Sequence, residues 1–144
     1  MKAGLTLIEL VLVLGIISIM AVGVFVNVRA NERRALENAS LALQADLRYA
    51  QRRAIMEGRR HGVMFDLRYN RYRIVVDRPR RTIRTVYLPE GITLAEASGP
   101  SLMFLPRGTA SAGFRVTLSS ETYRQELTAT VSGGRIRIFE MERN

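Results

Sequence analysis

The residues best suited to chemistry are arginines grouped at two places in the second half of the chain. Arg135 and Arg137 are two positions apart, so in an extended strand both side chains point to the same face. Strand geometry separates them by about 7 Å, and each guanidinium can make a bidentate contact with a phosphate. A second group, Arg78, Arg80 and Arg81, forms a basic connection. Both groups are candidate DNA-binding residues.

Two structural explanations compete with nucleic-acid binding for these arginines. Charged side chains on an edge strand prevent one sheet from pairing with another. The chain also has Lys2 as its single lysine among 22 basic residues, and a GC-rich genome favours arginine over lysine throughout. A preference for arginine does not explain the net charge of +9, which favours binding to polyanions.

The sequence offers little for catalysis. His61 is the only histidine, and it follows a predicted helix end, where we expect a solvated loop residue. The chain has no cysteine, which excludes a thiol nucleophile, a thiolate zinc site and a disulfide framework. No glycine-rich phosphate loop precedes a helix. We therefore expect no enzyme activity, no metal site and no cofactor.

Glu9 lies near the start of a long apolar segment. Residues Leu10–Val28 carry no charge, and a helix from Leu5 to Val28 would be about 36 Å long, enough to cross a hydrocarbon core of about 30 Å. An unpaired carboxylate at the bilayer centre costs about 3 kcal/mol. Glu9 therefore predicts a cationic partner, which is either Lys2 or a new α-amino group released by cleavage after Gly4.

Two common kinds of N-terminal segment provide alternative explanations. A secretory signal peptide has a shorter apolar core of about 7–15 residues, with a small-residue cleavage site after it. A simple membrane anchor would have the observed length, but it would leave Glu9 unexplained.

An amphipathic helix is predicted over residues 29–57. Its apolar positions recur at steps of three and four and form one face. They are Leu36, Ala39, Leu43, Leu47, Ala50 and Ala54. Gly58 suits the end of this helix. The two segments together predict one helix of about 50 residues, whose first half meets lipid or sister helices and whose second half lies against a domain.

From His61 onward the hydrophobic period changes to two, which predicts strands. The predicted strands occupy residues 61–67, 72–77, 82–88, 92–95, 102–105, 114–118, 123–131 and 135–139, and a polar tail follows at 140–144. The first two form a hairpin around 68–71. We therefore predict an α+β fold, in which a long N-terminal helix, half transmembrane and half amphipathic, packs on one face of an antiparallel β domain.

The sequence Gly4-Leu5-Thr6-Leu7-Ile8-Glu9 resembles the processing site of type IV prepilins and of type II secretion pseudopilins. That site has a short basic leader ending in glycine, a hydrophobic first mature residue and glutamate at the fifth mature position. The resemblance implies that a prepilin peptidase cuts between Gly4 and Leu5 and methylates the new N-terminus. It also implies that Glu9 acts in filament assembly. Leu5 departs from the phenylalanine usual in the family.

Segments 47–55, 63–65 and 104–108, with Gly113-Phe114, resemble the H-type minor pseudopilin (GspH) and FimT-like minor pilin family. The resemblance implies a pilin-like subunit at or near a filament tip, with other pilin or pseudopilin subunits as partners. It divides the chain into a prepilin leader at 1–4, a transmembrane and filament-core helix at 5–28, an amphipathic helix at 29–57 and a globular β domain at 58–144. The expected location is the inner membrane, with a single pass and the β domain outside the cytoplasm, and then the filament.

Three functions follow from these observations. The first interpretation is a minor pilin or pseudopilin of a type II secretion or type IV pilus filament, acting in protein secretion. The second is DNA uptake in natural transformation, because Gly134-Arg135-Ile136-Arg137 is similar to the DNA-binding motif of FimT-type minor pilins. The third is a membrane-anchored β domain that never polymerises.

Overall fold

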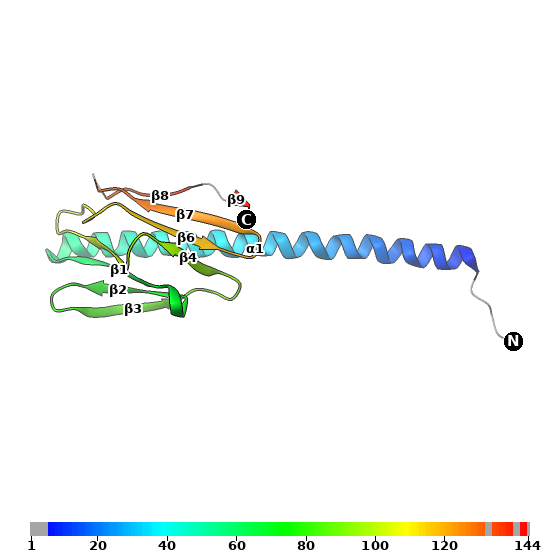
Figure 1. The fold of residues 1–144 in the computed structure, drawn as a ribbon, viewed down its shortest axis with the longest axis horizontal. Coiled ribbons are helices and arrows are strands. Elements are labelled where there is room, and N and C mark those ends of the chain that lie inside the picture. Colours follow the sequence, from blue (N-terminus) through cyan, green and yellow to red (C-terminus); the bar gives the residue numbers. More distant parts are fainter. Residues whose placement is uncertain (1–5, 132–133, 140–141, 144) are drawn as a thin grey trace.

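A computed structural model describes residues 6–131, 134–139 and 142–143, with side chains for all of these except 21–29 and 143. Its main feature is the α-helix α1 (Leu7–Glu57), which runs beside the β domain and projects far beyond it (Figure 1). The helix begins at Thr6, whose hydroxyl accepts a hydrogen bond from the backbone N–H of Glu9 at 3.4 Å. It ends at Gly58, whose φ of +62° is readily adopted by glycine. The predicted continuous helix is confirmed.

The membrane segment predicted at 5–28 stays a prediction. The part of the chain that the structure describes contains no helical stretch both long enough and apolar enough to cross a membrane. Residues 1–5 and the side chains of 21–29, on which much of that prediction depends, lie outside the described part. The proposed leader and the Gly4–Leu5 bond lie outside it as well.

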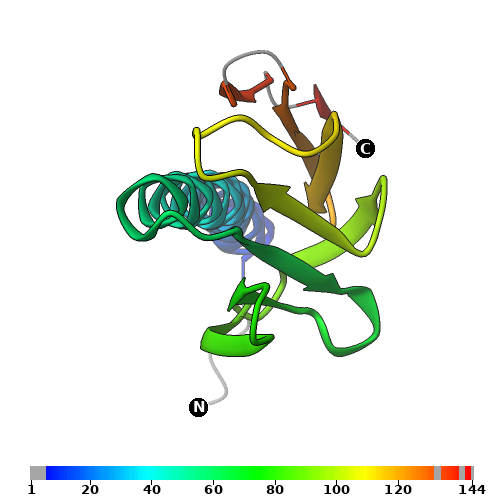
Figure 2. The ribbon, with the colours of Figure 1, turned by 90° about the vertical axis from the view of Figure 1, so that its left-hand side faces the viewer.

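The described strands form two antiparallel sheets beside the C-terminal half of α1 (Figures 1 and 2). The first sheet has the order β3-β2-β1-β5, with β1 (His61–Asp66), β2 (Arg71–Val76), β3 (Arg81–Tyr87) and β5 (Ser101–Phe104). The second has the order β4-β6-β7-β8, with β4 (Thr93–Ala97), β6 (Phe114–Ser119), β7 (Tyr123–Ala129) and β8 (Ile136–Ile138). A short 3₁₀ turn, η1 (Leu67–Tyr69), joins β1 to β2.

Two features of the sheets were not predicted. The strands divide between two sheets, because β4 pairs with β6 while β5 returns to β1. The polar tail contains β9 (Glu142–Arg143), which pairs with Tyr123 and Arg124 of β7. A period of two identifies strand residues without identifying their partners, which explains both differences.

Both sheets pack against one face of α1, and the core lies between them. The predicted apolar face is confirmed, because Leu36, Ala39, Leu43, Leu47, Ala50 and Ala54 are all buried. They contact buried side chains from both sheets, including Val63 and Ile74 of the first and Leu118 and Leu127 of the second. Each buried leucine contributes about 1.5–3 kcal/mol. This packing sets the rotation of the helix, and therefore which of its polar side chains face outward.

His61 is buried, so its prediction as a solvated loop residue is wrong. It is the first residue of β1 and is 0% exposed. Its Nδ1 lies 3.2 Å from the carbonyl oxygen of Arg59, and its Nε2 lies 3.0 Å from Oε2 of Glu57. The chain turns directly from the helix end into β1, which places the imidazole beneath the last turn of α1.

Glu32 ties α1 to the turn between β6 and β7. Its Oε1 accepts a hydrogen bond from the backbone N–H of Thr122 at 3.0 Å. Partial desolvation raises the pKa of Glu32, but hydrogen bonds from residues 120–122 outweigh it, so the pKa lies below the ordinary 4.5. Because the folded state lowers this pKa, the contact contributes its full stability above pH 4.5 and loses it as the pH falls through the lower folded-state value.

We expect the backbone amide resonance of Thr122 to move when the full chain, in detergent micelles, is titrated below pH 4.5. Protonation of Glu32 removes the charged acceptor of this hydrogen bond. Glu32→Gln should abolish the movement, whereas Glu37→Gln, on an exposed part of the same helix, should leave it intact. A Thr122 titration that persists in Glu32→Gln would contradict the assignment.

Candidate functional site

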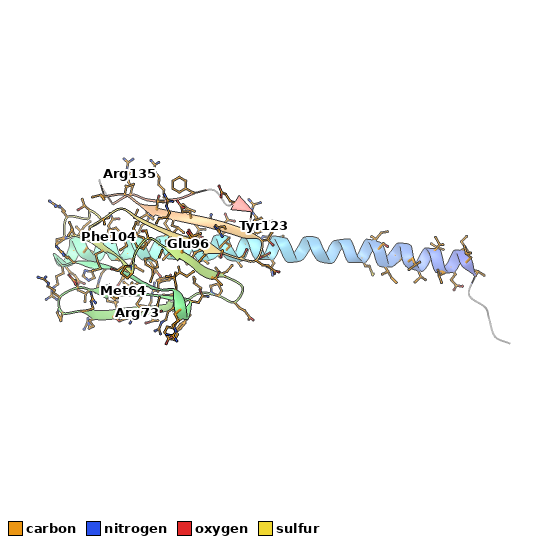
Figure 3. All side chains as sticks on the ribbon, in the orientation of Figure 1. Met64, Arg73, Glu96, Phe104, Tyr123 and Arg135 are labelled. Atoms are coloured by element: carbon orange, nitrogen blue, oxygen red, sulfur yellow. The ribbon has the colours of Figure 1, made fainter. Side chains whose placement is uncertain are left out.

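A groove of about 730 Å³ lies between α1 and the segment that leads into β8. We call it the helix–strand groove. Arg48 and Arg52 line it from the helix, and Arg135 and Arg137 line it from the strand side. All four side chains are exposed, and Figure 3 shows Arg135 at the edge of the domain. The structure thus places the two predicted C-terminal arginines together and adds two from the helix.

Two glutamine side chains of α1 bind the segment that leads into β8, which forms the side of the groove opposite the helix. Gln44 Nε2 donates a hydrogen bond to the carbonyl oxygen of Ile136 at 3.4 Å. Gln51 Nε2 donates to the carbonyl oxygens of Gly108 at 2.7 Å and Gly134 at 3.3 Å. Because both glutamines bond to backbone atoms, the segment leading into β8 is held against the helix at two separate positions.

Only glycine fits at position 134, where the segment leading into β8 lies close to the helix. Its φ is +58°, and a Cβ atom would lie 2.4 Å from the carbonyl oxygen of Gly108 and 2.3 Å from Gln51 Nε2. Side-chain-bearing residues rarely adopt this φ, and no atom fits at these distances. The glycine of the Gly-Arg-x-Arg sequence therefore lets the strand approach the helix closely.

The arginines of the helix–strand groove differ in their partners from other arginines of the domain. Arg53 pairs with Glu57 at 2.6 Å, and Arg115 pairs with Glu126 at 3.3 Å. Among the described residues, no carboxylate forms an ion pair with any arginine of the groove. The positive charge of this groove is therefore not neutralised within the described part of the chain.

The other predicted arginines do not join this groove. Arg78 lines a second groove of about 750 Å³, together with Arg59, Arg60 and Arg107, and Asp77 is the acidic residue of that lining. Arg80 lies in the turn between β2 and β3, and Arg81 is the first residue of β3; both are exposed and belong to neither lining. The structure thus divides the predicted arginines between two basic grooves and the exposed start of β3.

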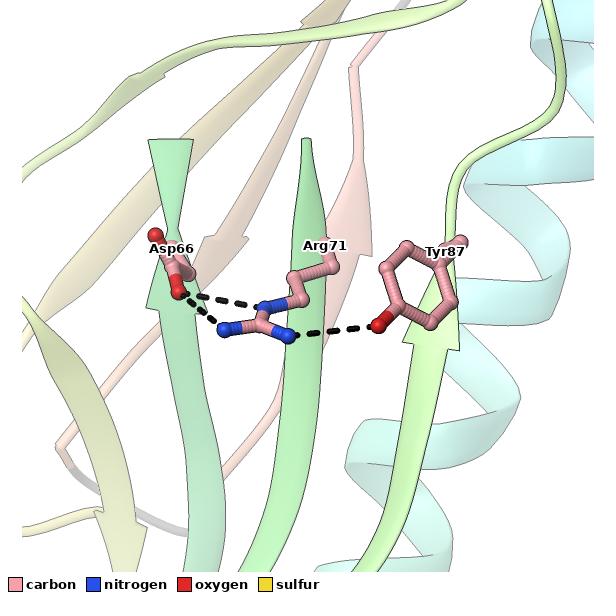
Figure 4. A network of polar contacts seen from close by, with 3 residues as sticks. All are labelled: Asp66, Arg71 and Tyr87. Carbon is pink, nitrogen blue, oxygen red and sulfur yellow. Dashed lines mark hydrogen bonds and ion pairs between the residues drawn. The ribbon is translucent and has the colours of Figure 1, made fainter. Parts of the chain in front are cut away.

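Arg71 is an arginine with a purely structural setting (Figure 4). Its Nε and Nη2 donate to Oδ2 of Asp66, each at 3.1 Å, and its Nη1 donates to the hydroxyl of Tyr87 at 3.2 Å. The hydrogen bond with Tyr87, and next that with Asp66, raises the pKa of Arg71. The guanidinium also lies 4.8 Å from the centre of the Tyr69 ring. These contacts link the three strands β1, β2 and β3.

A second structural network joins the helix to the first sheet. The Tyr72 hydroxyl donates to Oδ2 of Asp46 at 2.8 Å, and Arg84 forms an ion pair with the same carboxylate. Burial, and next the hydrogen bond to Asp46, raises the pKa of Tyr72. Because Tyr72 is only 1% exposed, its ring is part of the core.

Other predicted site features receive no structural test. Glu9 lies in the first turn of α1 with an exposed side chain, and both proposed partners, Lys2 and the amino group of Leu5, lie outside the described residues. Within residues 6–131, 134–139 and 142–143, no group of three His, Cys, Asp or Glu side chains could hold a metal ion. The expected lack of enzyme activity and of cofactors stays a prediction.

Sequence reasoning missed Arg48 and Arg52 as site residues. They are four positions apart, so a helix places them on the same face, and this signal was available. Their position opposite β8 could not be predicted, because it depends on how the helix is rotated about its axis relative to the second sheet. Arg107 was missed for a similar reason, since its loop approaches the helix end only in the folded chain.

Comparisons with known proteins agree with this fold. The family model described as "Type II transport protein GspH" matches residues 39–134. The solved structure of the minor pseudopilin EpsH from the type 2 secretion system of Vibrio cholerae is similar, with a TM-score of 0.63 and 18% identity, over 72% of this chain and 95% of that one. The type IV minor pilin FimU of Pseudomonas aeruginosa PAO1 has a TM-score of 0.61 and 17% identity, over 76% of this chain and 91% of that one.

No curated protein matches the chain in sequence. The two structural likenesses establish a shared fold, in which a long helix packs on antiparallel sheets, as predicted. The family match includes Arg48 and Arg52 and ends at Gly134, immediately before Arg135. Because the family model covers more than half of the residues, the chain belongs to the GspH family of type II transport proteins and has the pilin-like fold of minor pseudopilins and minor pilins.

Proposed function

We propose that the chain is a minor subunit of a type II secretion or type IV pilus filament and acts in protein secretion. The observation that carries this proposal is the contrast between the two ends of α1. The face of the helix beside the β domain is buried in the core, whereas residues 7–20 project beyond it, with Leu7 83%, Ile8 71% and Ile19 76% exposed (Figure 1). A continuous apolar surface of this kind is characteristic of an interaction site.

In this proposal, the projecting helix spans the inner membrane before assembly and packs against sister helices afterwards. A prepilin peptidase cuts between Gly4 and Leu5 and methylates the new amino group. The Glu9 carboxylate then pairs with an amino group of its own chain or of a neighbouring subunit, which sets the register of the helices. The β domain remains outside the cytoplasm, where it contacts other subunits or cargo.

The chain recovered from a sheared filament fraction should have lost residues 1–4 and gained one methyl group at Leu5. The proposal predicts both the loss of residues 1–4 and the presence of the chain in filaments. Recovery in the filament fraction tests assembly, and intact-protein mass spectrometry of that fraction tests the cleavage. Membrane-retained chain from cells lacking the peptidase is the control and should be full length. An unprocessed chain confined to the membrane fraction would indicate the simple anchor.

DNA uptake is the second candidate function. The specific observation that favours it is the helix–strand groove, where four arginines meet without a described acidic partner. Arginine suits phosphate because its planar fork can donate two hydrogen bonds at once. Binding of duplex DNA that weakens steeply with added salt would support this function, because phosphate contacts release counterions.

A further inference from the structure

We propose that the helix–strand groove grips one sugar–phosphate strand of duplex DNA from both sides, with Arg48 and Arg52 forming a helix wall and Arg135 and Arg137 a strand wall. This role rests on DNA binding as the function of the groove. It adds two helical arginines that lie outside the Gly-Arg-x-Arg sequence, and it selects duplex over single-stranded DNA.

The two walls have similar repeats. Arg48 and Arg52 are one helical turn apart, which separates their Cβ atoms by about 6 Å. Arg135 immediately precedes β8 and Arg137 lies within it, and in extended backbone two positions are separated by about 7 Å. Two facing rows of guanidinium groups with nearly equal spacing can contact successive phosphates of one strand, one row on each side.

The charge of the groove, which no described carboxylate neutralises, favours binding of an external anion. Arg48 and Arg52 face two more cations across the lining, and like charges brought together destabilise the folded state. Arginines that prevent an edge strand from pairing with another sheet would explain Arg135 and Arg137 but no other residues of the groove. It would not account for arginines on the opposite, helical wall. A bound polyanion accounts for both walls.

The rest of the lining favours contacts to the DNA backbone over contacts to bases. Among the described residues that line the groove, none is aromatic and none is acidic. Proteins that bind single strands gain about 1–3 kcal/mol per base by stacking on aromatic rings. Leu41, Ala45 and Ile136 provide no such surface. The groove is therefore suited to duplex DNA held through phosphates, without sequence preference.

The walls are held in place before DNA binds. Gln44 contacts the backbone between the two strand arginines, and Gln51 contacts the backbone immediately before them. Both glutamines lie on the same helix as Arg48 and Arg52, so one element sets the width of the groove. Because the backbone positions are set in advance, binding has to order only the ends of the arginine side chains.

The test uses the full chain in a non-ionic detergent and a fluorescent 30-base-pair duplex, with anisotropy measured over a range of salt concentrations. Arg48→Ala with Arg52→Ala removes the helix wall, and Arg135→Ala with Arg137→Ala removes the strand wall. Each pair should reduce the slope of log K against log salt by about 2 and weaken binding on the order of 10- to 100-fold.

Arg33→Ala with Arg34→Ala is the matched control, since it removes two exposed arginines of α1 outside the groove and changes net charge equally. Its effect should be much smaller than that of either wall. Circular dichroism of each variant is the control for folding and should match that of the wild type. A single-stranded competitor of the same length should be less effective than duplex, and random and fixed duplex sequences should compete equally.

The outcomes separate the two levels of the proposal. If the strand-wall pair weakens binding while the helix-wall pair behaves like the control, DNA binding stands and the two-walled groove is wrong. Single-stranded DNA that competes as well as duplex or better, or a preference for one duplex sequence, would also contradict the proposed contacts to the duplex backbone. If the wild-type chain does not bind DNA, the DNA-uptake function fails together with this inference, and an acidic protein partner becomes the explanation for the groove.

Discussion

Replacing Glu9 by glutamine should remove the chain from filaments while leaving its β domain folded. Glutamine has the size of glutamate but lacks the charge needed to pair with an N-terminal amine. Disrupting a desolvated ion pair by neutralising one partner costs about 3–5 kcal/mol, because the other charge is left unpaired. We therefore expect filament incorporation to fall by about 100-fold or more. The ratio of subunit in the sheared filament fraction to subunit in the membrane fraction measures it.

Two features make this experiment selective. The described hydrogen bonds of Glu9 at the start of α1 are made by its backbone N–H, to the hydroxyl and the carbonyl oxygen of Thr6, so the substitution retains that helix cap. Glu37→Gln, on an exposed position of the same helix, is the control and should be incorporated normally. Normal incorporation of Glu9→Gln would show that charge pairing at this position does not direct assembly.

Gly62→Ala should lower the free energy of unfolding by about 3 kcal/mol, which is near the largest effect usual for overpacking a core. Gly62 lies on β1, opposite Met103 of β5. A Cβ atom at this position would lie 2.2 Å from the carbonyl oxygen of Leu102 and 2.8 Å from the Cα of Met103. Both are backbone atoms, so the two strands would have to separate. We expect the melting temperature to fall by roughly 10–20 °C.

Near-UV circular dichroism of the full chain in detergent follows this transition through the packing of the tyrosines. Gly113→Ala is the control, because a Cβ atom there has no neighbour within 4 Å and no positive φ opposes it. Its melting temperature should equal that of the wild type. Equal melting of Gly62→Ala would show that β1 and β5 can move apart at little cost.

The proposed assembly and DNA-binding surfaces lie at different parts of the molecule. The exposed apolar part of α1 projects from one end of the β domain (Figure 1). The helix–strand groove lies on the domain itself, and its lining begins at Leu41, well beyond the projecting turns. A subunit whose N-terminal helix is packed among sister helices could therefore keep this groove open to solution. The two proposed functions therefore make the same prediction for the projecting helix, and DNA binding at the groove distinguishes them.

Much of the molecule could be predicted from local patterns alone. The steps of three and four from Leu36 to Ala54 identify one buried helical face, because the backbone geometry of a helix repeats regardless of what it packs against. Gly58 marks the helix end for an equally local reason, its left-handed backbone conformation. The first hairpin followed from the alternating pattern of its strands, whereas the pilin-like family followed from the resemblance of short sequence motifs to known members. For Arg135 and Arg137, strand geometry similarly predicted a shared face.

Other features depend on contacts between residues far apart in the chain. The division into two sheets arises because β5 pairs with β1 and β4 pairs with β6, a choice that alternation cannot encode. His61 is buried because the chain turns back beneath the helix. Arg48 and Arg52 acquire their place opposite β8 because the buried face of α1 fixes the rotation of the helix and Gln51 draws Gly134 against it. Periodicity indicates which side of an element is buried, and packing between elements determines what its other side faces.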